Sequence, residues 1–540
     1  MNHSHNVVRL TALVVALAIL LMVAGACAAP TPQVIEKPVV IEKPVIVKET
    51  IVVEKKVEVV VTATPAPKPT ARYVFLFIGD GMGVAQRTAA ELYLAATTGK
   101  KPEETRLLMN TFPAQGLITT YDANQFIPDS ASAGTALASG FKTTYGALGV
   151  DPAGKKLTSI AEMAKAKGKK VGIVTSVSTD NATPAVFYAH LRDRNDYYAI
   201  ALALGQSNFY YFGGGGLLEP KGADGSKPDA IAAAKANGYA IVTTRADFDK
   251  LAPGSKVWVI NAVLDKDKAL AYEIDRAKDD VSLAEYTRKG IALLDNPNGF
   301  FMMVEGGKID WASHANDAAT TIKDVLAFDA AIAEAVEFYK KHPDDALIVV
   351  TSDHETGGMA LGFAGTKDET NFERLANQKM SYLEFSKKVE EFRKTRGKNV
   401  KFEDMVSVIQ DAFGLVVLSS AERATLTQKA KSDKEAQKKL GMALSDLELQ
   451  EARSAFALSM KEPRDRLIDD LAYLLYGDSD PLTVKLTKIV SQKAGIGWTT
   501  FSHTAAPVRV SAIGVGDEQF VGNYDNTEIP KKIMMLAGLK

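Results

Sequence analysis

From Tyr73 onward, short apolar runs alternate with segments in which apolar residues recur every three or four positions. The runs are YVFLFI, KVGIVTS, GFFMMV, ALIVVTS and VRVSAIGV, and two of the intervening segments are LTSIAEMAKAKG and DAATTIKDVLAFDAAIAEAVEFYKK. A nearly continuous apolar run is typical of a strand buried on both faces, and the other spacing is typical of an amphipathic helix. The alternation predicts an α/β domain built on a doubly wound, mostly parallel sheet with helices on both faces.

Two long segments depart from this alternation. Residues 204–290 contain FGGGG and mixed polar sequence, which predicts a loop-rich excursion. Residues 366–498 are rich in Lys, Glu, Ala and Leu at helical spacing, which predicts an inserted helical subdomain that serves as a lid or contact surface. The α/β domain is then expected to comprise residues 71–365 and 499–540.

The first 27 residues are typical of an export signal, because Arg9 precedes a 17-residue apolar run that ends in small residues. Such a run is short for a bilayer core of ~30 Å, although a retained anchor is the alternative. Cys27 closes VAGAC, which resembles a bacterial lipobox with Ala24 in place of the usual Leu. Lipidation would attach the exported protein to the membrane of the cell envelope, whereas ordinary cleavage after AGA would leave a free thiol in the periplasm.

Residues 28–70 predict an extended stalk. VIEKPV occurs twice between Val34 and Val45, and seven prolines exclude a continuous helix. The Val-rich part could alternatively associate with a second copy through strand pairing. Over the whole chain, 64 basic residues balance 65 acidic ones, so composition gives no indication of a nucleic-acid-binding surface.

Side chains that bind metals stand next to four of the apolar runs. Asp80 follows YVFLFI, Glu305 follows GFFMMV, Asp353 and His354 follow ALIVVTS, and His503 precedes VRVSAIGV. Open α/β sheets bind ligands at the carboxyl ends of their strands. Each residue alone also fits a helix cap or a turn, but together they predict a metal site at one edge of the sheet.

The stretch VEGGKIDWASHAND adds two residues to this set. Asp310 and His314 are four apart, so one helical turn would point both at the same cation, and carboxylate with imidazole suits zinc. A capped, solvated helix start is the alternative. In IPDSASAGTALASG, Ser130 opens a predicted helix that ends at Gly140. A helix N-terminus favours an alkoxide and a phosphate, which makes Ser130 either a nucleophile or an N-cap.

These segments together resemble the alkaline phosphatase family, over roughly Tyr73 to Gly365 and again from about Thr499. The matching motifs are GDGMG, DSASAGTALASGFKTTYGALGVD, NATPAVFYAHLRDR, EGGKIDWASHAND, SDHETGG and SHTAAPVRV. The resemblance implies an enzyme that hydrolyses phosphate monoesters with two zinc ions and one magnesium ion. It also implies a homodimer, since relatives commonly form one.

The resemblance implies a role for each matching residue. The first zinc would be bound by Asp310, His314 and His503, and the second by Asp80, Asp353 and His354. Magnesium would be held by Thr183 and Glu305, with Asp80 bridging toward it. Ser130 would form the phosphoserine intermediate, Arg194 would clamp the phosphate with its planar fork, and Asp129 would hold Arg194.

Two positions depart from the family pattern. Asn181 stands where some relatives carry Asp and others His near the magnesium, and a neutral amide attracts a hydrated cation less strongly. Trp311 stands where relatives carry Lys or His beside the phosphate, so an indole replaces a charged contact to the substrate.

Two rival interpretations remain open. A phosphodiesterase or another hydrolase of the same superfamily would share the fold and the metals. Sulfatases, however, need a C/S-x-P-x-R element, and DSASAG lacks its proline and arginine. In the other interpretation the chain is a non-catalytic envelope protein that uses the enzyme core as a scaffold. The turnover of a monoester compared with that of a diester would test the first interpretation, and the zinc content of the purified protein would test the second.

Overall fold

The computed structural model describes residues 70–396, 400–466 and 469–539. The predicted export signal, Cys27 and nearly all of the predicted stalk lie outside these residues. The described residues belong to one compact unit. None of their helices is long and apolar enough to cross a membrane.

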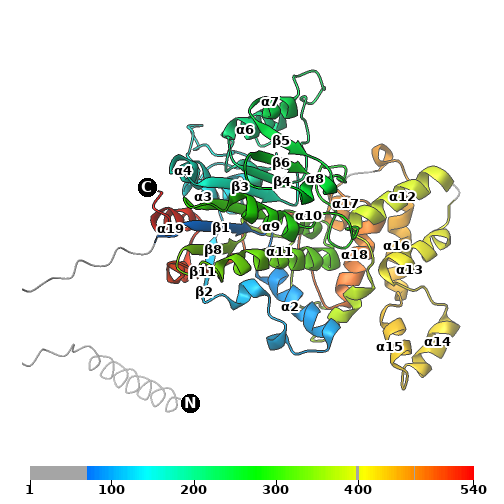
Figure 1. Cartoon of the computed structure of the whole chain (residues 1–540). Helices are drawn as coiled ribbons and strands as arrows, with labels where there is room; N and C mark the ends of the chain where they lie inside the picture. The colour runs from blue at the N-terminus through cyan, green and yellow to red at the C-terminus, as the bar shows by residue number, and fades with distance from the viewer. Residues whose placement is uncertain (1–69, 397–399, 467–468, 540) are drawn as a thin grey trace, which may run out of the picture. The chain divides into compact units, whose positions relative to one another are not determined.

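A ten-stranded sheet forms the centre of this unit, in the order β12-β2-β11-β8-β1-β7-β3-β4-β6-β5 (Figure 1). All neighbouring strands run parallel except β11, which is antiparallel to both β8 and β2. The predicted mostly parallel sheet is confirmed. The strands are β1 (Tyr73–Ile78), β2 (Ala114–Thr119), β3 (Lys170–Thr175), β4 (Tyr211–Gly214), β5 (Tyr239–Val242), β6 (Lys256–Ile260), β7 (Phe300–Glu305), β8 (Ala346–Thr351), β11 (Val508–Gly514) and β12 (Gly522–Asp525), and a separate two-stranded ribbon pairs β9 (Glu355–Thr356) with β10 (His503–Thr504).

Helices cover both faces of the sheet, because successive side chains of a strand point to opposite sides. Along β1, Phe75 and Phe77 enter one core with α2, α9 and α11, whereas Leu76 and Ile78 enter a second core with α3, α4, α6 and α19. Outside the insertion the helices are α2 (Val84–Thr98), α3 (Ser130–Ser139), α4 (Ile160–Ala166), α5 (Ala182–Ala185), α6 (Tyr197–Ser207), α7 (Ala230–Ala236), α8 (Arg245–Asp249), α9 (Leu283–Leu294), α10 (Lys308–His314), α11 (Ala318–Tyr339) and α19 (Glu528–Leu536).

Residues 204–290 are loop-rich as predicted, with long connections at 215–229 and 261–282, but the prediction that they depart from the α/β alternation is wrong. This segment contains β4, β5 and β6, which extend the sheet by three parallel strands, together with α7 and α8. The strands are only four or five residues long, and β4 ends in glycines that have low strand propensity. Their apolar pattern is therefore too short to be recognised in the sequence.

Helices fill the described part of residues 366–498. They contribute Phe385, Ile409, Leu482 and Leu486 to the core that already holds α2, α9 and α11, so that core continues from the sheet into these helices. The helices are α12 (Tyr382–Arg396), α13 (Val406–Phe413), α14 (Ser420–Lys429), α15 (Lys434–Gly441), α16 (Asp446–Ser459), α17 (Asp470–Tyr476) and α18 (Pro481–Lys493).

Candidate metal centre and nucleophile

The candidate site forms where the parallel strands β1, β7 and β8 end. Ile78 lies in register with Glu305 on one side and Thr351 on the other, so the residues that follow these strands emerge side by side. His503 precedes β11 instead of following it. It reaches the same edge because β11 runs antiparallel, and because His503 itself pairs with Thr356 in the β9–β10 ribbon.

Helix α10 brings Asp310 and His314 to this edge, as the spacing of four predicts. The Nε2 atom of His314 lies 3.3 Å from Oδ2 of Asp310 and 3.2 Å from Nε2 of His503. The Nε2 atom of His503 lies 3.8 Å from Oδ1 of Asp310. The two histidines and the aspartate therefore turn their ligand atoms toward one point, although 189 residues separate His314 from His503.

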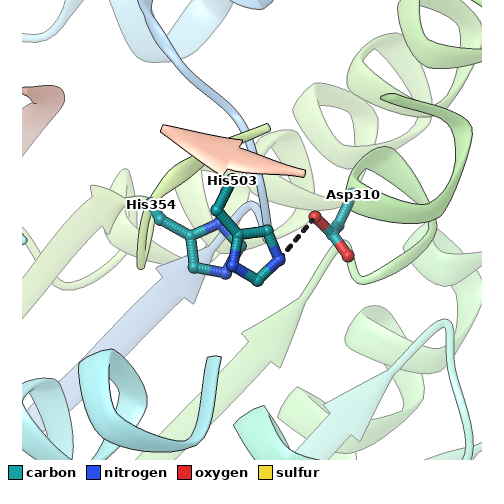
Figure 2. Close-up of side chains that lie close together, drawn as sticks. All are labelled: Asp310, His354 and His503. Atoms are coloured by element: carbon teal, nitrogen blue, oxygen red, sulfur yellow. Dashed lines mark ion pairs between the residues drawn. The ribbon is translucent and has the colours of Figure 1, made fainter. Parts of the chain in front are cut away.

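His354 lies where two groups of possible metal ligands meet. One group is Asp310, His354 and His503, and the other is Asp80, Asp353 and His354; within each group the ligand atoms lie within 4.8 Å of one another. The Nε2 atom of His354 is 3.5 Å from a carboxylate oxygen of Asp80 and of Asp353. Its ring stacks on that of His503 with centroids 3.7 Å apart, and Asp310 faces this pair (Figure 2).

Ser130 lies against this cluster as the first residue of α3. Its Oγ atom is 3.2 Å from Nε2 of His354, and the residue is buried. The N-cap is Asp129, whose carboxylate accepts the backbone N–H of Ser132. Because the neighbouring aspartate caps the helix, the hydroxyl of Ser130 remains directed at the metal-ligand cluster.

Arg194 reaches the site through a fully buried carboxylate. Its Nη1 donates to Oδ2 of Asp129 at 2.9 Å, while its backbone N–H donates to the carbonyl of Gly146 at 2.8 Å. The N–H of Gly146 in turn donates to Oδ1 of Asp129. Burial acts to raise the pKa of Asp129, but the charge of Arg194 and the hydrogen bonds from Ser132 and Gly146 together outweigh it and hold the pKa below its usual range. Arg194 is thus held by Asp129, the residue that precedes Ser130.

The residues expected to bind magnesium lie behind Asp80. Thr183 Oγ1 is 3.4 Å from Oδ2 of Asp80, and Glu305 is fully buried and accepts the hydroxyl of Thr175. Asn181 caps the short helix α5 that carries Thr183, and its Oδ1 accepts the N–H of Ala182 at 2.7 Å. The amide of Asn181 therefore bonds to the backbone.

Trp311 follows Asp310 on α10 and is half-buried. The ammonium of Lys308 lies 4.9 Å from the centre of its indole, and pairs with Asp265 at 2.6 Å. Lys308 is almost fully buried, which lowers its pKa despite the neighbouring Asp265. The ammonium of Lys308, two residues before Asp310, therefore places a positive charge close to Trp311.

The carboxylates of the centre strongly perturb one another. Burial and the charge of Asp353 raise the pKa of Asp80 well above its usual range, and burial raises that of Glu305 to about 8. Burial also acts to raise the pKa of Asp310, but His314, with smaller contributions from His503 and His354, outweighs it and holds that pKa far below its usual range. Buried like charges of this kind call for compensating cations.

Three buried carboxylate oxygens of this centre accept no hydrogen bond: Oδ1 of Asp80, Oε1 of Glu305 and Oδ2 of Asp353. A buried anionic oxygen without a partner is costly. Together with the imidazoles, these oxygens form a donor set that suits divalent cations, nitrogen with oxygen for zinc and oxygen alone for magnesium. The residues present therefore fit the expected metals.

Several neighbours that orient the ligands were not predicted. Thr356 donates its hydroxyl to Oδ1 of Asp310, and the Nδ1 atoms of His314 and His503 bond the carbonyls of Phe501 and Pro128. Such contacts fix which ring nitrogen is left to bind a metal. Thr356 lies inside the SDHETGG motif, whereas nothing in the sequence marks a particular backbone carbonyl.

A mostly parallel sheet that gathers imidazoles and carboxylates around a buried serine defines a metal-dependent α/β enzyme. The chain belongs to the alkaline phosphatase family, because the family model described as alkaline phosphatase matches residues 71–443 and 475–539. Members of this family are metal-dependent phosphoric monoester hydrolases, and the chain is an enzyme of this type.

Individual relatives agree with this membership. The chain is 33% identical to alkaline phosphatase 3 of Bacillus subtilis over 472 residues, which cover 85% of this chain and 87% of that protein. The crystal structure of Thermus thermophilus alkaline phosphatase superposes with a TM-score of 0.68 at 26% identity, covering 88% of this chain and 93% of that one. A mutant of the TAB5 alkaline phosphatase, described with magnesium bound in its M3 site, gives a TM-score of 0.57 at 26% identity and covers 87% and 99%.

Proposed function

We propose that this enzyme hydrolyses phosphate monoesters outside the cytoplasm through a phosphoserine formed on Ser130, with two zinc ions and one magnesium ion. The observation that carries the proposal is the contact between Ser130 Oγ and His354, the histidine shared by both ligand groups. A nucleophile in this place stands next to two cation sites at once.

The donor sets indicate which residues would hold each ion. Asp310, His314 and His503 would bind one zinc, and Asp80, Asp353 and His354 would bind the other, since both sets combine imidazole nitrogen with carboxylate oxygen. Thr183 and Glu305 would hold magnesium together with Asp80, because all three offer only oxygen. The magnesium in the M3 site of the TAB5 mutant supports this third cation. When bound, a pair of divalent ions stabilises charge on the attacking and the leaving oxygen.

Each step of the reaction can then be assigned to a residue of the chain. Arg194 would hold two phosphate oxygens with its planar fork, in an orientation fixed by Asp129. Ser130 Oγ, at the positive end of α3, would give up its proton and attack phosphorus, so that a Ser–O–P bond forms as the bond to the alcohol oxygen breaks and that oxygen takes up a proton. Water would then attack phosphorus, the serine oxygen would leave and regain its proton, and phosphate would depart.

The identity of the nucleophile is tested by Ser130→Ala. The variant should lose at least about 10³-fold of its activity on an aryl phosphate monoester while keeping its zinc, because the hydroxyl is absent and the ligands remain. Ser139→Ala is the matched control, since Ser139 lies at the other end of the same helix and bonds only the Thr135 and Phe141 backbone. Full activity in the Ser130 variant would refute the assignment.

The substrate class is tested by comparing turnover of a phosphate monoester and a phosphate diester by the same purified enzyme. Arg194 can pair with two free phosphate oxygens of a monoester, whereas esterification of one oxygen leaves fewer for it. The monoester should therefore be hydrolysed much faster. A faster diester reaction would make the chain a phosphodiesterase of the same fold.

The site of action and the membrane attachment are proposed from the sequence. We infer that the first 27 residues direct export and that Cys27 is lipidated, which would tether the enzyme to the cell envelope through the segment of residues 28–70. Growth with a labelled fatty acid should label the full chain and leave a Cys27→Ser variant unlabelled. Equal label in both would exclude lipidation of Cys27. A homodimer, as in relatives, is proposed as well and is tested by the mass of the purified chain in solution.

A further inference from the structure

We propose that Asn316 is a positioning residue that sets His314 and His503 at the spacing needed for one zinc ion. This inference rests on the proposed function, because it assigns these two histidines to the same cation. Asn316 is not itself a proposed ligand. It would act by increasing the affinity of one of the two zinc sites.

Asn316 connects the metal-bearing helix α10 to α11 in an unusual conformation. Its φ of 50° lies in the left-handed region, and the residue is 1% exposed. A left-handed conformation is uncommon for a residue with a side chain and costs free energy unless its surroundings stabilise it. Asparagine tolerates the conformation best when its short amide can bond nearby backbone.

The amide of Asn316 bonds two separate parts of the centre. Its Nδ2 donates to the carbonyl of Ser313 at 3.1 Å, in the last turn of α10 beside His314. It also donates to the carbonyl of Thr500 at 2.9 Å, in the segment that leads to His503. One side chain therefore connects the two backbone segments that supply the histidines.

His314 makes a second contact with the same segment. Its Nδ1 bonds the carbonyl of Phe501, the residue after Thr500. Asn316 and His314 thus bond two adjacent carbonyls, those of Thr500 and Phe501. These two bonds fix the position of the segment that leads to His503 relative to α10. Loss of the amide would leave the position of His503 relative to His314 determined by the histidine alone.

Helix α18 of the inserted region supports the same corner. Ser491 donates its hydroxyl to the carbonyl of Asn316 at 3.3 Å, and Thr487 donates to the carbonyl of Ala315 at 3.3 Å. These carbonyls follow the end of α10, where the helix leaves backbone groups without intrahelical partners. The inserted helices therefore contribute to the geometry of the zinc ligands through Asn316.

Two substitutions test the proposal. Asn316→Gly retains the left-handed backbone but removes the amide, and Asn316→Asp retains the shape while replacing the donor with an acceptor that faces two carbonyls. Asn208→Gly is the matched control, because Asn208 also has a left-handed backbone, with φ of 54°, but ends α6 on the surface. Zinc binding is measured by titrating metal-free protein with zinc against a chromophoric chelator.

In the parent and in Asn208→Gly, the titration should show two tight zinc equivalents. In both Asn316 variants, one equivalent should weaken by about 10- to 100-fold while the other stays unchanged, as loss of a neighbour that orients a ligand predicts. A general loss of structure would weaken both equivalents together or lower the helical circular dichroism signal, and would overturn the proposal. So would unchanged affinity in both variants. A parent that binds no zinc would overturn the proposed metals as well.

Discussion

Asp129 combines three interactions in one carboxylate. It caps α3, accepts the N–H of Gly146 and pairs with Arg194. The same group therefore fixes the start of the helix that carries Ser130 and the orientation of the guanidinium proposed to hold phosphate. Capping, charge pairing and the proposed orientation of the substrate are therefore coupled at this residue.

Replacing Arg194 by Ala should mainly weaken substrate binding. A hydrogen bond to a charged group contributes about 1.5–3 kcal/mol, which corresponds to roughly 10- to 150-fold. The inhibition constant of inorganic phosphate and the KM of a monoester should rise by that factor, whereas the zinc content should not change. Arg192→Ala is the control, because Arg192 bonds the carbonyl of Ala153 at the surface. Equal inhibition constants in the two variants would contradict a role for Arg194 in phosphate binding.

Glu305→Gln should separate magnesium from zinc. The carboxylate is fully buried and one of its oxygens has no partner, so it offers a charged ligand that the amide lacks. We expect the magnesium concentration for half-maximal activation to rise by about 10- to 100-fold with both zinc equivalents retained. Activity and metal content measured over a magnesium series provide the check. Activation at the parental concentration would exclude Glu305 as a ligand.

The sequence predicted the candidate ligands by residue type and by position at strand ends, as for Asp80, Asp353 and His354, and the fold brings these three together. It did not predict Thr356 or Asn316, because their roles depend on contacts with residues far away in the chain. Asn316 bonds Thr500 across 184 residues, and only the fold brings these two together. A side chain that acts by orienting another carries no local pattern of its own.

At the scale of elements, the long apolar runs identified the central strands, because β1, β7 and β8 each consist of six consecutive buried residues. The short strands β4 to β6 were missed because four or five residues, partly glycine, do not make a distinct pattern. Helix α11 was recognised because its spacing persists over 22 residues. Length therefore decided which elements could be predicted.

Gln378 ties the inserted region to the start of α11. Its Nε2 donates to both carboxylate oxygens of Asp317, at 2.8 and 2.9 Å, and both residues are buried. Gln378→Ala should lower the free energy of unfolding by about 1–3 kcal/mol, because Asp317 loses a buried partner. Gln437→Ala should change it by less than about 0.5 kcal/mol, because Gln437 is exposed. Urea unfolding of both variants tests this, and equal midpoints would contradict it.

Asp275 should make the stability of the protein depend on pH. Burial raises its pKa to about 6 from an ordinary value of 3.8, while it accepts the N–H of Ser381. The folded state thus binds this proton more tightly than the unfolded state, so the residue costs stability as pH rises from about 4 to 6 and beyond. Asp275→Asn keeps an acceptor for Ser381 and removes that cost.

The gain from Asp275→Asn should reach at most about 3 kcal/mol at pH 8 and fall to roughly half of that at pH 5. The parent protein, unfolded in urea at the same two pH values, is the control. A gain that is equal at both pH values, or larger at pH 5, would show that burial does not raise this pKa in the folded protein.

At the scale of the whole molecule, the centre depends on closure of the entire chain. Its candidate ligands extend from Asp80 to His503, and they meet only because β1, β7, β8 and β11 are adjacent in the sheet. The core that lies on one face of this sheet also continues into the inserted helices. Metal binding and global folding should therefore be linked.

Removal of the metals should accordingly destabilise the whole protein and not only abolish activity. An ion that binds the folded state alone contributes about 2.7 kcal/mol when its free concentration is a hundred times its dissociation constant. Chelator should thus lower the thermal midpoint, and zinc should restore it. Ser130→Ala should show the same shift although it is inactive, because its hydroxyl is not among the proposed ligands. Equal unfolding temperatures for chelated and zinc-loaded protein would contradict this prediction. They would mean that the folded protein tolerates its buried carboxylates without cations, although some of their oxygens accept no hydrogen bond.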